Sequence, residues 1–144
     1  MELVRQKRMK VYPVVFTETK DEKDTVLIYI PDFDGMTEGY GLADAIAMAK
    51  DYIGNCLYSK KDNEFPVPSE IEAVSPESSI FAGKGKTFVS LVDIDVDFFR
   101  RKNKSKVVRR NITLPEWLDD MATNEKINVS AVTQNALKQC LGLV

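Results

Sequence analysis

The hydrophobic pattern of residues 107–143 predicts one short strand followed by two short helices. Residues 107–114 alternate, and successive strand residues point to opposite faces. One face carries Val108, Arg110, Ile112 and Leu114, of which Ile112 and Leu114 are expected to enter a core. The opposite face carries hydrogen-bonding side chains, namely Arg109, Asn111 and Thr113. Pro115 ends the strand and suits the first position of a helix, where its missing N–H costs no hydrogen bond.

Both predicted helices carry an apolar stripe. The stripe of the first consists of Leu118, Met121 and Ala122, with Trp117 at its border. Asn128 is a good N-cap for the second helix. Its apolar positions follow i, i+3, i+4, i+7 spacing and are Val129, Val132, Thr133, Ala136, Leu137, Cys140 and Leu141. Gly142 is expected to close this helix as a C-cap.

A strand and two helices of this size predict association with a second chain. Units well below about 40 residues rarely bury a core without help, and a lone strand leaves N–H and C=O groups that invite pairing. Pairing with the same strand of a second chain would bury Ile112 and Leu114. It would expose six polar side chains on a two-stranded ribbon, which fits the DNA major groove.

This arrangement resembles the ribbon-helix-helix family of DNA-binding proteins, through the RxNxTLP strand and the helices PEWLDDMA and NVSAVTQNAL. The base readers that the resemblance implies are Arg109, Asn111 and Thr113. The N–H groups near Asn128 and Ser130 would hold a phosphate at a helix N-terminus. Ala131 and Gln134 stand where many members carry an acidic residue and an arginine.

Two residues of the ribbon have alternative interpretations. Thr113 with Glu116 fits a capping box, and Arg109 fits an ordinary solvated strand position. The preceding residues 99–106, FRRKNKSK, are interpreted as a mobile basic linker. This linker either stays solvated or contacts phosphates on the way into the ribbon.

The first part of the chain predicts an α+β fold, a sheet with one helix on its face. Strands are expected at 11–16 and 25–30, joined by a polar hairpin loop, and Pro13 argues that the first is an edge or bulged. A long helix is expected over about residues 42–58, with the apolar face Leu42, Ile46, Ala49, Ile53 and Leu57. Further strands are expected at 71–74 and 87–99.

Carboxylates gather at two places. The strand 87–99 carries Asp93, Asp95 and Asp97 on one face, about 6.6–6.8 Å apart, so they do not converge on one ion. The turn at Asp32 and Asp34 departs from the calcium-loop pattern. A divalent-metal ribonuclease using the three strand aspartates is the enzyme hypothesis. We instead expect a solvated or partner-facing acidic stripe, with no metal and no catalytic site.

Composition narrows the possible classes of protein further. The 144 residues suit one domain plus a small second unit, and the chain has no histidine, the commonest general base and metal ligand. Cys56 and Cys140 are expected to be reduced and packed. No apolar run approaches the roughly 20 residues of a membrane span. The N-terminus lacks the apolar segment of a signal peptide, which favours a cytoplasmic protein.

Charge divides the chain unevenly. Residues 1–98 hold 11 Lys and Arg against 18 Asp and Glu, a net charge of −7. Residues 99–144 hold 9 against 4, a net charge of +5. The basic part suits a polyanion such as DNA. The acidic part suits either solvent or a basic partner.

The first part also resembles the HicB antitoxin family. The likeness lies in YPVVFTE, YIPDFDGMTEGYGLADAIAMAKDYIGNCL, FPVPSEIE and VSLVDIDVDFFRR, in the family's order and followed by a ribbon-helix-helix tail. Gly41 stands where the family usually has a capping Thr, a small change at an N-cap. The resemblance implies a toxin-neutralising domain at 1–98 with a degraded RNase H-like fold, a linker at 99–106 and a DNA-binding and dimerisation unit at 107–144.

The function that this resemblance implies is an antitoxin without enzymatic activity or cofactor. It would block a HicA-like ribonuclease toxin, which cleaves mRNA, and bind operator DNA as a homodimer or tetramer to repress its operon. The carboxylates facing the toxin would be Asp32, Asp34, Glu38, Asp93, Asp95 and Asp97. The alternative is a ribbon-helix-helix transcription regulator whose N-terminal domain senses a small molecule.

Overall fold

The computed structural model describes residues 9–143. The N-terminal segment that was predicted not to be a signal peptide therefore lies partly outside the described residues, since residues 1–8 are not among them. Contacts divide the described chain into two compact units, Met9–Lys104 and residues 105–143. Each is described by itself below. Across residues 9–143, no helix has the length and apolar character needed to cross a membrane.

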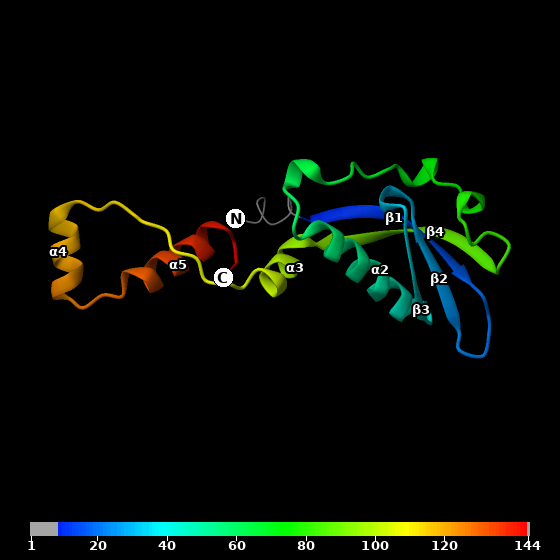
Figure 1. Cartoon of the computed structure of the whole chain (residues 1–144), viewed down its shortest axis with the longest axis horizontal. Helices are drawn as coiled ribbons and strands as arrows, with labels where there is room; N and C mark the ends of the chain where they lie inside the picture. The colour runs from blue at the N-terminus through cyan, green and yellow to red at the C-terminus, as the bar shows by residue number, and fades with distance from the viewer. Residues whose placement is uncertain (1–8, 144) are drawn as a thin grey trace. The chain divides into compact units, whose positions relative to one another are not determined.

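The unit Met9–Lys104 is built on a four-stranded antiparallel sheet in the order β3-β2-β1-β4 (Figure 1). The strands are β1 (Met9–Glu18), β2 (Thr25–Ile30), β3 (Gly35–Tyr40) and β4 (Lys86–Asp95). The predicted strands at 11–16 and 25–30 are confirmed. The sequence did not predict β3, because GMTEGY combines two glycines with polar residues and lacks an apolar alternation.

Pro13 lies where β1 changes from an edge strand to an inner strand. β4 pairs with β1 along its whole length, whereas the register with β2 begins at Val15. Pro13 has no N–H to donate, and it occupies a position with a paired strand on one side. The prediction that this strand is an edge is therefore wrong, because β1 lies between β2 and β4; Pro13 is tolerated because β2 does not pair with this part of β1.

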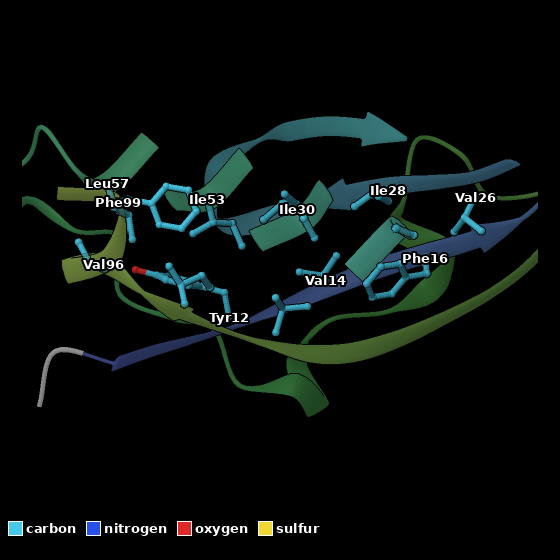
Figure 2. Close-up of a cluster of buried hydrophobic side chains, with 14 residues drawn as sticks. Tyr12, Val14, Phe16, Val26, Ile28, Ile30, Ile53, Leu57, Val96 and Phe99 are labelled. Carbon is cyan, nitrogen blue, oxygen red and sulfur yellow. The ribbon is translucent and has the colours of Figure 1, made fainter. Parts of the chain in front are cut away.

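The helix α2 (Leu42–Leu57) covers one face of the sheet and confirms the predicted helix (Figure 2). Its predicted face is wrong at two positions, since Leu42 and Ile46 are exposed. The buried residues of α2 are Ala45, Ala49, Ile53, Gly54 and Leu57. Small residues face the sheet because the helix lies close to β3, where a Cβ on Gly39 would meet the Ala45 nitrogen at 2.6 Å.

The other face of the sheet is also covered at its centre. Val15 and Thr17 are fully buried, although they point away from the α2 side. The segment between α2 and β4 contacts β4 through the short 3₁₀ helices η3 (Ile71–Ala73) and η4 (Pro76–Ser78). The predicted strand at 71–74 is therefore wrong, because this stretch forms a turn of 3₁₀ helix.

β4 ends at Asp95, and α3 (Val96–Asn103) follows at once. The predicted strand at 87–99 is wrong from Val96 onward. The Asp95 carboxylate accepts a hydrogen bond from the Phe98 N–H at 3.2 Å and acts as the N-cap of α3. The apolar alternation in the sequence continues past this cap, yet Val96 and Phe99 are buried at helical spacing.

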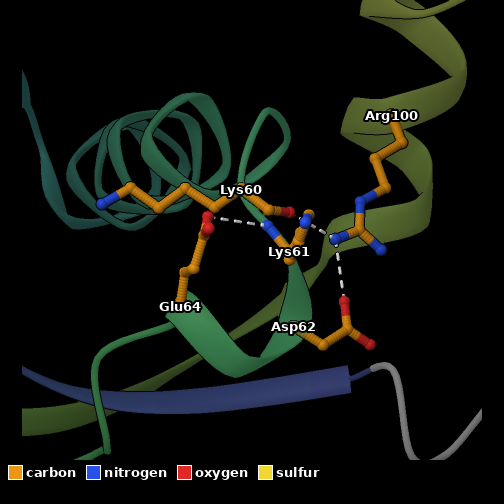
Figure 3. A network of polar contacts seen from close by, with 5 residues as sticks. All are labelled: Lys60, Lys61, Asp62, Glu64 and Arg100. Atoms are coloured by element: carbon orange, nitrogen blue, oxygen red, sulfur yellow. Dashed lines mark hydrogen bonds and ion pairs between the residues drawn. The ribbon is translucent and has the colours of Figure 1, made fainter.

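Arg100 fixes α3 to the loop after α2, as Figure 3 shows. Its Nη2 donates to the Lys60 carbonyl at 2.9 Å and to Asp62 Oδ1 at 2.8 Å. Its guanidinium also lies over the Phe65 ring, 5.5 Å from the centroid. Residues 99–103, predicted to be mobile linker, are therefore helix, and the unit ends at Lys104.

The second unit contains α4 (Glu116–Asn124) and α5 (Val129–Cys140). Asn128 caps α5 as predicted, since its Oδ1 accepts from the Ala131 N–H at 3.1 Å. Gly142, at φ +71°, closes the helix as predicted, donating to the Gln139 carbonyl while Leu143 donates to the Lys138 carbonyl. The same pair of bonds ends α4 around Lys126, at φ +55°.

Candidate DNA-binding and partner-binding surfaces

The predicted base readers lie in an exposed segment. Residues 104–115 carry no strand within the described chain, and Arg109, Asn111 and Thr113 are all exposed. A ribbon needs a second strand to donate and accept its ladder hydrogen bonds. Because the predicted second strand belongs to another copy of the chain, the pairing of this segment stays a prediction.

Thr113 is not the cap of α4. The helix begins after Pro115, which takes the N-cap position, and it has no side-chain cap hydrogen bond. The alternative in which Thr113 and Glu116 form a capping box is therefore wrong. The Thr113 hydroxyl is left on the same exposed segment as the other two predicted base readers.

The second unit has a large exposed apolar surface. No residue between 105 and 143 is buried within the chain. The predicted inward position Ile112 is 50% exposed, and the apolar stripes of both helices are open. The large exposed side chains of α4, α5 and the turn between them are Trp117, Leu118, Met121, Ile127, Val132 and Leu137. An apolar surface of this kind marks an interaction site.

The N-terminus of α5 keeps part of its capacity for an anion. The Asn128 side chain satisfies the Ala131 N–H. The N–H groups of Val129 and Ser130 belong to the first turn, where N–H groups have no partner inside the helix. Asn128 and Ser130 are both exposed. The predicted phosphate contact at Asn128 and Ser130 thus remains a prediction with compatible geometry.

The six predicted partner-facing carboxylates fall into two groups. The first group lies around β3, and Asp32 in it is structural: it accepts from the Ser69 N–H at 3.0 Å and from the Ser69 hydroxyl at 2.5 Å. Asp34, at φ +44°, lies 3.4 Å from the Tyr29 hydroxyl, which donates to it. Glu38 is exposed on the edge strand β3.

The second group lies where β4 meets α3. Asp93 pairs with Lys50 of α2 at 3.1 Å, and this ammonium lowers the pKa of the Asp93 carboxyl. Asp95 caps α3, and Asp97 lies in the first turn of that helix. The predicted one-face stripe is wrong at Asp97, because the strand has already ended. Among residues 9–143, no three carboxylates or thiols lie close enough to hold a metal ion.

The unit boundary changes where the basic charge lies. Four of the nine Lys and Arg after residue 98 belong to α3 or its C-cap: Arg100, Arg101, Lys102 and Lys104. Residues 9–104 hold 12 Lys and Arg against 17 Asp and Glu, a net charge of −5. Residues 105–144 hold 5 against 4, a net charge of +1. The sequence analysis did not predict α3. The signal that could have indicated its start is Asp95, a good N-cap residue that accepts a hydrogen bond from the Phe98 N–H three residues later.

The two cysteines differ in their surroundings. Cys56 on α2 is half-buried, and this burial raises the pKa of its thiol. Cys140 at the end of α5 is exposed in the chain, so the expectation of a packed thiol is wrong for the described chain at this position.

Comparison with known proteins places the whole chain in one family. The model of the HicB-like antitoxin of bacterial toxin–antitoxin systems matches residues 12–137. A toxin–antitoxin complex from Streptococcus pneumoniae contains a chain of similar fold, with 24% identity, a TM-score of 0.54, and coverage of 91% of this chain and 98% of that chain.

The crystal structure of the Burkholderia pseudomallei antitoxin HicB has 22% identity and a TM-score of 0.46, with 92% of this chain and 96% of that chain covered. A comparison with curated proteins gives no significant match. The family model spans both structural units, from Tyr12 in β1 to Leu137 in α5. The chain therefore belongs to the HicB-like antitoxin family of bacterial toxin–antitoxin systems.

Proposed function

We propose that this antitoxin neutralises a HicA-type ribonuclease toxin through Met9–Lys104 and represses its own operon through a dimeric ribbon-helix-helix formed by residues 105–144. The first unit has a buried core, and residues 9–104 carry a net charge of −5, which supports a role in binding a basic partner. We infer that this unit has the degraded RNase H-like fold that the family resemblance implies. The second unit supplies the DNA-binding ribbon.

The observation that carries the DNA-binding half is the exposure of the apolar face beside the predicted readers. Ile112 and the apolar stripes of α4 and α5 are solvent-exposed in one chain. Arg109, Asn111 and Thr113 occupy the positions that alternate with Arg110, Ile112 and Leu114 along the exposed segment before α4. Pairing two copies buries the apolar face and leaves the hydrogen-bonding face on the outside of the ribbon. Arg and Asn on such a ribbon read guanine and adenine edges in the major groove.

Toxin neutralisation follows from membership of the antitoxin family and from the acidic charge of Met9–Lys104. Complementary charge speeds encounter with a basic partner and disfavours wrong ones. Because α3 packs on α2 through Phe99, the smallest neutralising fragment should be residues 1–104 rather than 1–98. Co-expression of residues 1–104 with the toxin should restore growth, and continued arrest by a stably expressed fragment would contradict the toxin-binding half.

The decisive experiment for the other half is a gel-shift titration with the operon's upstream DNA, combined with molar mass by light scattering. Arg109→Ala or Asn111→Ala should each weaken specific binding by about tenfold or more, since a bidentate base contact is worth about 1–3 kcal/mol. The molar mass should stay that of the wild type.

Matched controls are Lys138→Ala and Asn135→Ala, which remove the same kinds of side chain from exposed positions on α5. Both should bind operator DNA within about twofold of the wild type, because they lie outside the predicted ribbon. Operator binding that survives the Arg109 and Asn111 changes would reject these residues as base readers. A monomeric wild-type mass at the concentrations of the titration would reject the paired ribbon itself.

A further inference from the structure

A pocket of about 350 Å³ opens between α2, the C-terminal end of β4 and the first turn of α3. All three elements belong to the unit Met9–Lys104. Its apolar wall includes Ile94 and Phe99, which are buried, and Phe98, which is 53% exposed. The pocket lining therefore combines buried apolar side chains with one aromatic side chain that is half exposed.

The mouth of the pocket is acidic. Three carboxylates line it, namely Asp51, Asp93 and Asp95, against the single ammonium of Lys50. Lys50 already pairs with Asp93 at 3.1 Å, and one oxygen of Asp95 accepts from the Phe98 N–H. Asp51 lies off the buried face of α2 and is exposed. The lining thus keeps a net charge of −2 above an apolar floor.

A long cationic side chain matches both parts of this lining. The aliphatic stem of an arginine packs on apolar surface while its charged head reaches a polar rim. Its planar guanidinium pairs with carboxylates through two N–H groups and stacks on aromatic faces. The molecule contains this combination once already, because Arg100 pairs with Asp62 and lies over Phe65.

The exposure of the lining favours a side chain over a free small molecule. Sites for small ligands enclose about 70–90% of the ligand's surface, whereas Asp51, Asp93 and Phe98 are all exposed at this mouth. A side chain presented by a larger partner needs no such enclosure, since the partner's own surface closes the pocket. Aromatic side chains are also frequent among the hot-spot residues of protein interfaces.

We propose that this pocket receives an arginine side chain of the toxin, held between Asp51 and Asp95 with its guanidinium on Phe98. The inference rests on the proposed neutralisation of a toxin and adds the residues that anchor it. It places the strongest part of the interface at the junction of α2, β4 and α3, away from the other acidic group around β3.

The experiment measures binding of the full-length antitoxin to the purified, catalytically inactivated toxin encoded beside it, by calorimetry at low and high salt. Phe98→Ala should weaken binding about tenfold or more, as expected for a hot-spot aromatic. Asp51→Asn should weaken binding several-fold at low salt, with a smaller loss at high salt, since an exposed charge pair is screened by ions.

Matched controls remove a carboxylate and a large apolar side chain elsewhere: Glu72→Gln on η3 and Ile80→Ala before β4, both exposed. They should bind within about twofold of the wild type. Replacing each toxin arginine by lysine should identify one whose loss is not additive with Asp51→Asn, because residues in contact are energetically coupled. Unchanged melting temperatures of the antitoxin variants establish that the fold is intact.

The outcomes separate the two proposals. Wild-type antitoxin that fails to bind the toxin would reject toxin neutralisation, and the anchor with it. Wild-type binding with Phe98→Ala and Asp51→Asn equal to their controls would reject the arginine anchor and leave neutralisation standing. Additive effects of Asp51→Asn with every toxin arginine would likewise reject the anchor.

Discussion

The two units of this chain bury their apolar residues to very different extents. Met9–Lys104 has a continuous core between α2 and the sheet, in which Tyr12, Phe16 and Ile53 are almost completely buried. Residues 105–143 have no buried residue within the chain, although Asn128 caps α5 and both helices end in backbone cap bonds. Local signals thus define the helices, whereas a stable unit needs buried area. We expect residues 105–143 to gain that area from a second copy of the chain.

This contrast predicts two kinds of unfolding transition in the full-length protein. The transition of Met9–Lys104 should not depend on protein concentration, because its core lies within one chain. The transition of residues 105–144 should move to higher temperature as concentration rises, because association stabilises the folded state by mass action. Variants that move one transition and not the other sharpen the comparison.

The largest expected effect comes from Phe99→Ala, which removes the ring that packs on Gly54 and joins α3 to α2. Phe99 is 8% exposed, so truncation should cost about 3–5 kcal/mol in the free energy of unfolding. Chemical denaturation would show it as a lower midpoint of the concentration-independent transition. Phe98→Ala is the matched control, and it should cost much less because Phe98 is half exposed. Equal losses at the two positions would mean that α3 is not packed on α2 through Phe99.

An intermediate effect is expected from Tyr12 at alkaline pH. Burial, with a smaller contribution from the Asp32 charge, raises the pKa of Tyr12 to about 12. The unfolded chain ionises near the ordinary value of about 10, so full stability is present below that pH and is lost as the pH rises through 12. The loss should reach about 2–3 kcal/mol, because each pKa unit corresponds to about 1.4 kcal/mol.

Denaturant titrations between pH 9 and pH 12 would measure this loss. Tyr12→Phe should cost about 1 kcal/mol at neutral pH, since its hydroxyl donates to the Pro66 carbonyl at 2.8 Å. It should then flatten the alkaline decline, whereas Tyr40→Phe, at an exposed position, should leave the decline unchanged. A decline that is identical in Tyr12→Phe would assign it to other groups.

The smallest effect is expected from the cap of α5. Asn128→Ala removes the hydrogen bond to the Ala131 N–H and should cost about 1 kcal/mol. It should lower the midpoint temperature of the concentration-dependent transition and leave that of the concentration-independent transition unchanged. Asn135→Ala, inside the same helix, should be neutral or slightly stabilising because Ala is the better helix former. A shift of the concentration-independent transition by Asn128→Ala would contradict the separation into two units.

Local sequence signals predicted the elements that rest on local interactions. The alternation of β1 and β2, the period of α2 and the caps at Asn128 and Gly142 were all legible in the chain. β3 was not, because GMTEGY has two glycines and no apolar alternation, and its place in the sheet comes from pairing with β2. α3 was not predicted either, because the alternation of apolar and acidic residues in VDIDVDFF, which is typical of a strand, continues past Asp95, where the helix begins.

The candidate sites divide in the same way. The alternation of residues 107–114 selects the predicted base readers, yet their pairing depends on a second chain that no local pattern places. The acidic residues could be counted from the sequence, but their roles could not. Asp32 and Asp95 turned out to hold backbone groups of the fold, because a carboxylate in a turn or at a helix start accepts N–H bonds as readily as it faces solvent.

Trp117 is the single tryptophan of the chain, and it lies in the unit without a core, 64% exposed on α4. Indole emission shifts to shorter wavelength when the ring leaves water, and excitation at the red edge of aromatic absorption avoids the tyrosines. Fluorescence of the unmodified protein therefore reports on residues 105–144 without a label. Dilution would reveal self-association as a shift in the wavelength of tryptophan emission. Met9–Lys104 would not contribute to this signal, because it contains no tryptophan.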